Sequence, residues 1–514
     1  MASRIDRLLC DSDHAASLIH DGQTIVSGGF VGAAHPEALT AAIERRFLAE
    51  AGPRDLTLLF AAGQGDGKSR GLNHLAHQGL LRRAIGGHWA LIPALGRMAI
   101  AGQIEAYNFP QGVICQLIRD IAAGRPGCIT HVGLGTFIDP VNRGGRLNDA
   151  TPEELVSRIE LDGRTWLFYR AFPIHVGLIR ATAADPFGNL VMDEEAVVGE
   201  VLPIAQAAHN GGGKVIAQVR RILDRPAPPH QVKVPGVLVD HVVIASEDEH
   251  AQTFAEARNS SYFSPRFDDQ DSKSTGVEHL PAGARRIIAS RACDELLPGA
   301  IANLGIGMPE GIGVIAAERQ MLDQFTLTLE SGPIGGIPAG GLSFGASAWP
   351  EAIIDQPAQF DFYDGGGLDY AALGAAQVDR HGNVNVSKFH DRVAGVGGFV
   401  NISQNARRVV FCGALTSGGL EVEVKDGQLR IIREGSIRKF VDHVEQVSFS
   451  GAVAAESGRE ILYVTERAVF ELTANGLRLT EVAPGIDIQT QILNLIDFEP
   501  IIDDVRPMAA SCFV

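Results

Sequence analysis

Residues 24–39 read TIVSGGFVGAAHPEAL, an apolar run followed by a glycine-rich turn and then by Pro-Glu at the start of a helical pattern. A second stretch, AIANLGIGMPEGIGVIA at residues 300–316, has the same layout, with Pro36 and Pro309 in matching places. Proline suits the first turn of a helix because its missing N–H would be unpaired there in any case. Both stretches therefore predict a strand, a tight turn and a helix, built twice in one chain.

Three further pairs of segments match in the same order along the chain. They are LTLLFAAG (56–63) with FTLTLESG (325–332), ATAADPFGNL (181–190) with AAQVDRHGNV (375–384), and IAQAAHNGGGKVIAQV (204–219) with ISQNARRVVFCGAL (402–415). Strands alternate with helical stretches and glycine turns, which predicts an α/β fold made of two homologous open α/β domains that arose by internal duplication. The polar stretch 250–281 has no apolar periodicity and predicts a linker between domains at 1–249 and 282–514.

The composition excludes several classes of protein. The chain has 514 residues, 44 basic against 61 acidic, and a formal net charge of −17. An acidic chain lacks the basic surface that displaces counterions from phosphates, so we expect no nucleic-acid partner. The six cysteines form no C-x-x-C pair, and no stretch reaches the roughly 18 apolar residues of a membrane span. These features, with an acidic N-terminus that does not resemble a signal peptide, predict a cytoplasmic protein without a membrane partner.

The duplication singles out Glu330. Aligning the two β-rich segments places Ala61 opposite Glu330, so one copy ends its strand with a methyl group and the other with a carboxylate. Carboxyl ends of strands in open α/β sheets are where ligands bind, and the glycine-rich run SGPIGGIPAGG that follows lets backbone approach a ligand closely. On the pattern alone, a solvated loop glutamate remains the alternative.

Two other motifs compete for a functional role. Gly305 and Gly307 between a strand and a helix, with an acidic residue some twenty positions later, partly match a dinucleotide site, although Glu310 stands where the third glycine belongs. Residues 341–345, GLSFG, fit G-x-S-x-G but lack the strand that a nucleophile elbow requires directly before it. The sixteen histidines show no H-E-x-x-H spacing, and we expect no metal site.

The sequence around Glu330-Ser331-Gly332 resembles family I coenzyme A transferases, in particular the single-chain acetate/propionate type in which two related halves are fused. The resemblance covers nearly the whole chain. The runs that carry it are GGFVGAAHPEAL, EAYNFPQGV, THVGLGTFIDP, LESGPIGG, GLSFGASAWPEAIID and AGVGGFVNI. Most family members have Asn after the glutamate, and Ser331 fits the acetate/propionate branch.

The resemblance implies ping-pong transfer of CoA from an acyl-CoA to a short-chain carboxylate, with Glu330 as the nucleophile and a glutamyl-CoA thioester as the intermediate. Gln111 matches the position whose side-chain amide donates to the oxyanion, and Gly397 matches the backbone N–H donor. If the halves pack face to face, Gln111 from the first would meet Glu330 and Gly397 from the second. The other positions that the resemblance assigns to substrate or CoA binding are Gly28, Gly29, Ser331, Gly332, Gly395 and Gly398.

The same resemblance implies no tightly bound cofactor, since CoA is substrate and covalent intermediate, and small carboxylic acids and acyl-CoA as partners. It also implies a homodimer or homotetramer. Two other hypotheses remain at this stage: a nicotinamide-dependent oxidoreductase using Gly305 to Glu330, and a non-catalytic acyl-CoA sensor on the same fold.

Overall fold

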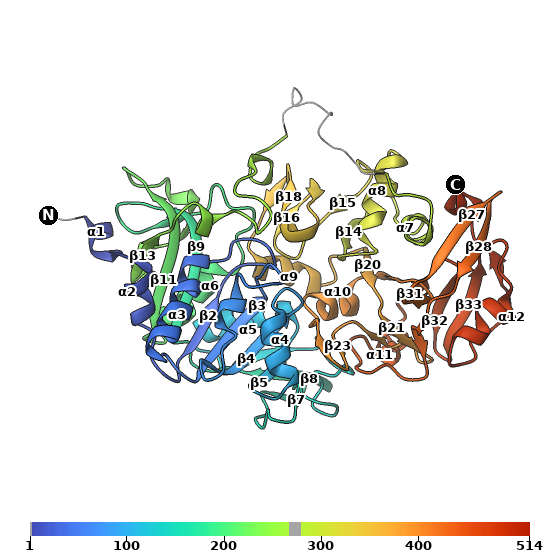
Figure 1. Cartoon of the computed structure of the whole chain (residues 1–514), viewed down its shortest axis with the longest axis horizontal. Coiled ribbons are helices and arrows are strands. Elements are labelled where there is room, and N and C mark those ends of the chain that lie inside the picture. The colour runs from blue at the N-terminus through green and yellow to red at the C-terminus, as the bar shows by residue number, and fades with distance from the viewer. Residues whose placement is uncertain (1–2, 267–278) are drawn as a thin grey trace. The chain divides into compact units, whose positions relative to one another are not determined.

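The computed structural model describes residues 3–266 and 279–514 (Figure 1). The chain folds into two compact units that are not continuous in sequence. Unit 1 contains Met1–Arg266, Leu329–Asp361 and Asp391–Asn401, and unit 2 contains Phe267–Thr328, Phe362–His390 and Ile402–Val514. The predicted domains 1–249 and 282–514 are the two duplicated halves of the chain. The compact units are divided differently from these halves, so the predicted boundaries stay a prediction.

Unit 1 is built on a ten-stranded sheet. Its main path runs in the order β1 (Leu9–Cys10), β13 (His241–Ile244), β11 (Lys214–Ile222), β9 (Val176–Ala184), β2 (Thr24–Ser27), β3 (Leu56–Ala62), β4 (Leu81–His88) and β5 (Glu105–Asn108), all parallel. Strands β10 (Leu190–Val191) and β12 (Val232–Val234) add an antiparallel extension beside β9. Every residue of β2, β3 and β9 is buried, as expected for parallel strands covered on both faces.

Helices connect these strands. Unit 1 contains α1 (Arg4–Leu8), α2 (Ser12–Ser17), α3 (Glu37–Glu50), α4 (Pro93–Ile100), α5 (Gln111–Ala122) and α6 (Val201–Asn210). A small antiparallel sheet orders β6 (Gly127–Thr130), β8 (Arg164–Arg170) and β7 (Val156–Leu161). Two helices cross the division between the units, α9 (Gln356–Asp364) and α10 (Phe399–Asn405). The described residues include no helix long and apolar enough to cross a lipid bilayer.

Unit 2 has its own eight-stranded sheet. The order is β15 (Thr326–Leu327), β14 (Ile301–Leu304), β20 (Tyr370–Gly374), β25 (Arg408–Cys412), β31 (Glu460–Val464), β32 (Ala468–Thr473), β33 (Gly476–Val482) and β34 (Arg506–Pro507). The path from β15 to β31 is parallel, and β32 pairs antiparallel with both of its neighbours. Its helices are α7 (Ala284–Cys293), α8 (Glu310–Glu318), α11 (Gly451–Glu456) and α12 (Ile488–Gln491).

The duplication is visible in the strand order. The order β3-β2-β9-β11-β13 in unit 1 corresponds to β15-β14-β20-β25-β31 in unit 2. The matched Asp-x-x-Gly-Asn loops are also alike, because Asp185 accepts the N–H of Asn189 at 2.9 Å and Asp379 accepts the N–H of Asn383 at 3.1 Å. The predicted α/β fold with two homologous domains is therefore confirmed.

Two local expectations differ from the structure. The strand predicted over FTLTLESG is only two residues long, because the chain turns after Thr328 and the N–H of Leu329 donates to the carbonyl oxygen of Pro333 at 2.9 Å. The predicted linker begins with packed residues: His250 and Thr253 are buried, and the Thr253 hydroxyl lies 2.9 Å from that of Ser343. Of the rest of that linker, residues 267–278 lie outside the described residues.

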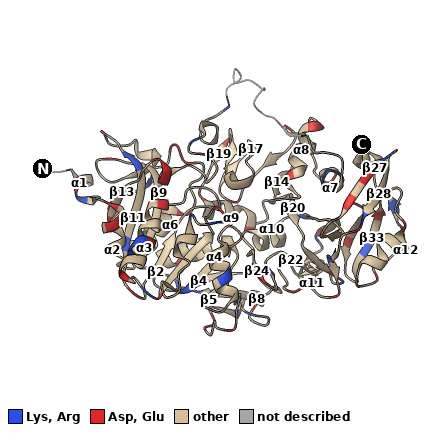
Figure 2. Cartoon of the chain, viewed as in Figure 1, with Lys and Arg blue, Asp and Glu red and all other residues tan. Residues whose placement is uncertain are grey.

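The charged side chains are interspersed. In the view of Figure 2, Lys and Arg alternate with Asp and Glu over the elements rather than gathering on one face. In unit 1 the strand order reverses between β2 and β9, and the chain leaves β2 directly into Gly28 and Gly29. Ligands of open α/β sheets bind at such a reversal, beyond the carboxyl ends of the strands.

Candidate active site

Glu330 stands on a turn that backbone hydrogen bonds hold in place. The Ser331 hydroxyl donates to the carbonyl oxygen of Gly345 at 2.5 Å, and the N–H of Ile354 donates to the carbonyl oxygen of Gly332 at 3.1 Å. Gly332 has a φ of +117° and lies directly against the Ile354 carbonyl, so a side chain there would meet both strain and a clash. Ser331 and Gly332 therefore serve to position Glu330.

The carboxylate of Glu330 is held by the glycine segment 395–398. A Cβ atom built on Gly398 would lie 2.5 Å from Oε2 of Glu330, and the backbone N–H of Gly398 donates to the carboxylate. Burial raises the pKa of Glu330 to about 7, against the opposing effect of that hydrogen bond. The residue as a whole nevertheless keeps partial solvent exposure.

Gln111 lies beside the same segment, at the first position of α5. Its backbone N–H donates to the carbonyl oxygen of Gly397 at 2.9 Å. Its side chain is 1% exposed, and the amide Nε2 has no hydrogen-bond partner among the described residues. The amide oxygen lies 3.6 Å from a Cβ atom built on Gly397. Gln111 therefore brings an unpaired buried donor to the glycine segment that contacts Glu330.

Gly397 is engaged differently from the role that the resemblance assigns to it. Its N–H donates to the carbonyl oxygen of Gly87 at 3.0 Å, so the N–H that faces the Glu330 carboxylate is that of the next residue, Gly398. Gly395 lies directly against the same Gly87 carbonyl with a φ of +73° and forms a β-bridge with His88. Gly395 and Gly397 thus anchor the segment that carries Gly398.

Gly28 and Gly29 lie at the strand reversal of unit 1. The N–H of Gly28 continues the ladder by donating to the carbonyl oxygen of Leu178 at 3.0 Å. Gly29 has a φ of +118°, and a Cβ atom on it would lie 2.9 Å from the carbonyl oxygen of Ala34. A Cβ atom on Gly199, at the start of α6, would lie 3.8 Å from the N of Gly29. The turn is therefore crowded by backbone, and contact with CoA at these two residues stays a prediction.

His88 was not among the predicted residues. It ends β4, and its Cβ and Cδ2 atoms lie 3.6 and 3.8 Å from the Cβ position built on Gly397. Burial lowers the pKa of His88 to about 4, so its imidazole is neutral at physiological pH, and Nδ1 has no partner among the described residues. The rule that strand ends carry ligand contacts could have drawn attention to it, since it follows Gly86-Gly87 at the end of an apolar run.

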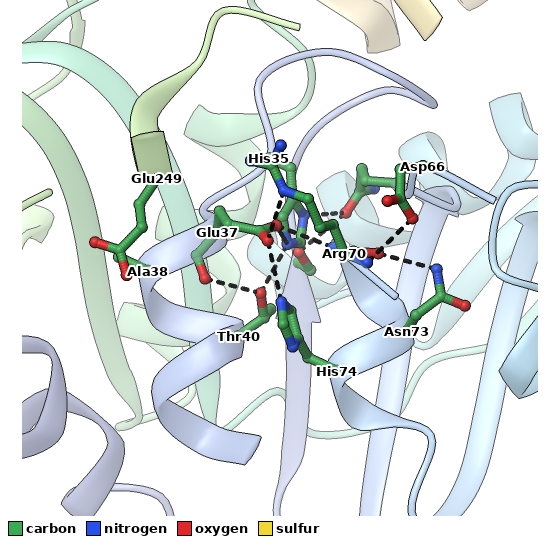
Figure 3. Close-up of polar contacts among 12 residues, drawn as sticks. His35, Glu37, Ala38, Thr40, Asp66, Arg70, Asn73, His74 and Glu249 are labelled. Atoms are coloured by element: carbon green, nitrogen blue, oxygen red, sulfur yellow. Dashed lines mark hydrogen bonds and ion pairs between the residues drawn. The ribbon is translucent and has the colours of Figure 1, made fainter. Parts of the chain in front are cut away.

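A second polar cluster in unit 1 has a different character (Figure 3). Glu37 accepts hydrogen bonds from the N–H of Gly71 at 2.9 Å, from His74 at 3.0 Å and from Arg70 at 3.2 Å. Burial would raise the pKa of Glu37, but the hydrogen bond from His74 and the neighbouring charges outweigh it and bring the pKa down to about 2. Glu37 is therefore a paired, structural carboxylate, whereas burial shifts the pKa of Glu330 in the opposite direction.

The comparisons with known proteins agree with this geometry. Residues 11–245 match the family model described as coenzyme A transferase. The chain is 41% identical over 506 residues to acetate CoA-transferase YdiF of Escherichia coli K12. The alignment covers 98% of this chain and 94% of that protein. It is 43% identical over 507 residues to caffeate CoA-transferase of Acetobacterium woodii, covering 97% and 96%. The chain belongs to the coenzyme A transferase family.

A solved structure supports the same assignment to the coenzyme A transferases. The acyl-CoA transferase YdiF of E. coli O157:H7, in a thioester complex with CoA, superimposes with a TM-score of 0.92 at 38% identity, covering 98% of this chain and 96% of that one. The nicotinamide and nucleophile-elbow alternatives lose their support. Ser343, for example, lies in a short 3-10 helix (Gly341–Ser343) and donates to Glu256 at 2.7 Å. Within the described residues there is no cluster of three or more His, Cys, Asp or Glu side chains able to hold a metal ion.

Proposed function

We propose that this coenzyme A transferase moves CoA from an acyl-CoA to a short-chain carboxylate through a thioester on Glu330. The observation that supports this most directly is the surroundings of Glu330. Its carboxylate has a pKa raised to about 7 by burial, receives the N–H of Gly398, and lies against Gly398, the neighbour of the Gly397 that Gln111 contacts. These are the parts that covalent transfer through a carboxylate requires.

The proposed reaction has two exchanges, each of which conserves atoms. An oxygen of Glu330 attacks the thioester carbonyl carbon, the C–S bond breaks, and a mixed anhydride and CoA thiolate form. The thiolate then attacks the Glu330 carbonyl carbon, the bond between that carbon and the bridging anhydride oxygen breaks, and the free acid leaves with that oxygen. A second carboxylate reverses these steps and leaves with CoA. One thioester replaces another, so CoA enters as substrate and the chemistry uses no tightly bound cofactor.

The environment raises the reactivity of Glu330. A carboxylate whose pKa is raised by burial is a stronger base and nucleophile once it is ionised. Both exchanges pass through a tetrahedral carbon that carries a developing oxyanion. The N–H of Gly398, which already donates to Glu330, and the unpaired Nε2 of Gln111 are the donors we assign to it. One such donor typically lowers the barrier by about 3 kcal/mol.

The relatives suggest the substrates and the setting. Acetate and caffeate, named for two of them, are both carboxylates without a second charge. We propose acetate, propionate or a similar short acid as acceptor for this enzyme, which acts as a homodimer or homotetramer in the cytoplasm. Both the acidic composition and the scattered cysteines support that location.

A single mass measurement tests the proposal. The intact protein is mixed with propionyl-CoA without any acceptor acid, digested, and searched for CoA on the peptide that contains Glu330. We expect covalent CoA on wild type and none on Glu330→Gln, whose side chain has the same shape but no nucleophilic oxygen. If the wild-type protein binds propionyl-CoA but never carries CoA covalently, it is a sensor, and the proposal is overturned.

A further inference from the structure

Three buried polar side chains of unit 1 are unsatisfied. Both carboxylate oxygens of Glu200 and both amide ends of Gln356 and Gln359 have no hydrogen-bond partner among the described residues, and all three side chains are 0% exposed. Burying a polar group without a hydrogen-bond partner is unfavourable, so native proteins keep few such groups without a reason. A cluster of such groups indicates hydrogen-bond partners that the folded chain itself does not supply.

These side chains are adjacent to the turn that carries Glu330. The N–H of Ile354 donates to Gly332, and two residues later the N–H of Gln356 donates to the carbonyl oxygen of Gly199 at 3.0 Å. Residues 354–356 therefore bridge the Glu330 turn on one side and the residue before Glu200 on the other. Gln359 lies one turn further along α9, on the same face of the helix as Gln356.

Three helices have their N-terminal ends in unit 1 at or near these residues. α5 begins at Gln111, α9 begins at Gln356, and Glu200 is the N-cap of α6, although its side chain makes no capping hydrogen bond. α9 meets the start of α5 because Phe360 lies 2.5 Å from a Cβ atom built on Gly112. Helix N-termini favour negative charge through their free N–H groups and the helix dipole. Glu200 and Gln356 thus both stand at helix starts, where free backbone N–H groups favour an anion.

Glu200 can donate a hydrogen bond to such an anion. Burial raises its pKa to about 8, so its carboxyl group is mostly neutral at pH 7 and can donate a hydrogen bond. The charged side chains on elements packed against or bonded to the start of α6 are Arg119 and Asp120 on α5, Arg180 on β9, Lys214, Arg220 and Arg221 on β11, Lys233 on β12, Asp361 on α9, and Asp355 just before it. Burial, rather than any of these charges, sets the pKa of Glu200.

We propose that Glu200 and Gln356, assisted by Gln359, form a subsite that binds the carboxylate of the free acid while CoA is attached to Glu330. This inference rests on the proposed function. In that reaction the acid leaves the reacting carbon, and water must not take its place there. The O–H of the neutral Glu200 carboxyl donates a hydrogen bond to one oxygen of the acid. The Gln356 amide donates a hydrogen bond to the other oxygen. No bond to the acid is formed or broken at this subsite.

Steady-state kinetics with propionyl-CoA as donor and acetate as acceptor test the subsite. In Glu200→Ala we expect KM for acetate to rise about tenfold or more, because a hydrogen bond to a charged group is lost. Formation of covalent CoA on Glu330 from propionyl-CoA alone should stay within a few-fold of wild type. Glu200→Gln keeps a neutral donor and should retain a KM near that of wild type at pH 7, while Gln356→Met should raise KM as Glu200→Ala does.

The dependence on pH separates this role from a structural one. In wild type, KM for acetate should rise as pH increases through about 8, because ionised Glu200 repels the acid, and in Glu200→Gln this rise should vanish. Glu310→Gln is the matched control, since Glu310 also begins a helix and has a pKa raised by burial, but lies in unit 2. An unchanged KM in Glu200→Ala, or a rise with pH that persists in Glu200→Gln, overturns the subsite. Absence of covalent CoA on wild type would instead overturn the proposed function.

Discussion

Gly398 lies against Glu330 with no room for another atom between them: a Cβ atom on Gly398 would come within 2.5 Å of Oε2 and 2.6 Å of Cδ of that carboxylate. The backbone N–H of the same glycine donates to the carboxylate. The glycine is required here by the neighbouring side chain and not by its own backbone, whose φ lies in the ordinary range for other residues. A residue with any side chain at this position would compete with the nucleophile for space.

Replacing Gly398 by Ala should displace the nucleophile. The added methyl must move the carboxylate by about an ångström or more, and a misplacement of that size can cost about 100-fold in rate. The rate of covalent CoA formation on Glu330 measures the effect. Gly374→Ala is the control, because nothing lies within 4 Å of a Cβ atom there and its backbone is unstrained. A Gly398→Ala enzyme with the rate of wild type would show that Glu330 has another place from which to react.

Removing the amide of Gln111 should slow the chemistry without loosening the binding of CoA. Gln111→Ala should lower kcat/KM for propionyl-CoA by about 100-fold, as expected for the loss of one oxyanion donor worth about 3 kcal/mol. Gln116→Ala, on the same helix, should change stability instead, because the Gln116 side chain bonds to Asp361 and to the carbonyl oxygen of Pro357. Equal effects of the two variants on the rate would remove the special role of Gln111.

The covalent step should become faster with rising pH. The Glu330 carboxyl has a pKa raised to about 7, and only its ionised form attacks, so the rate should increase by about tenfold between pH 6 and pH 8. Rapid-quench detection of covalent CoA on Glu330, with propionyl-CoA as the only substrate, measures this profile. His88→Asn is the informative control, since the pKa of His88 is lowered to about 4 and cannot produce a transition near 7. A transition that disappears in His88→Asn would assign it to the imidazole.

The paired carboxylate of Glu37 should affect stability rather than catalysis. Its folded-state pKa of about 2 lies below the ordinary value of 4.5, so its stabilisation is present above about pH 4.5 and is lost as pH falls towards 2. Glu37→Gln should lower the free energy of unfolding by about 2 kcal/mol at pH 7 and weaken the dependence of Tm on acid. Glu50→Gln, which disturbs only an exposed pair with Arg46, should leave Tm nearly unchanged.

Local patterns in the sequence predicted much of the fold. The turn after β2 and the Asp-x-x-Gly-Asn loops are short segments whose glycines, prolines and carboxylates determine their own geometry, and both copies fold as expected. The contrast between Ala61 and Glu330 needed only the alignment of two strands. The early end of β15 was not predictable, because it depends on the hydrogen bond between Leu329 and Pro333 across the turn.

Contacts distant in sequence were harder to predict. Glu200 and Gln356 stand in ordinary surroundings along the chain, and only their burial without partners distinguishes them. His88 likewise resembles any strand-end histidine until its distance from Gly397 is known. Resemblance placed the backbone donor at Gly397, while the hydrogen bond from Gly397 to Gly87 leaves Gly398 facing the carboxylate.

Unit 1 draws residues from both copies of the duplication, since 329–361 and 391–401 of the second copy fold with the first 266 residues. The compact units therefore do not coincide with the ancestral copies. A chain cut between residues 267 and 278 would yield two polypeptides that have to recognise each other before Gln111 and Glu330 share one environment. Fusion of the copies into one gene product secures their equal supply and makes that encounter intramolecular.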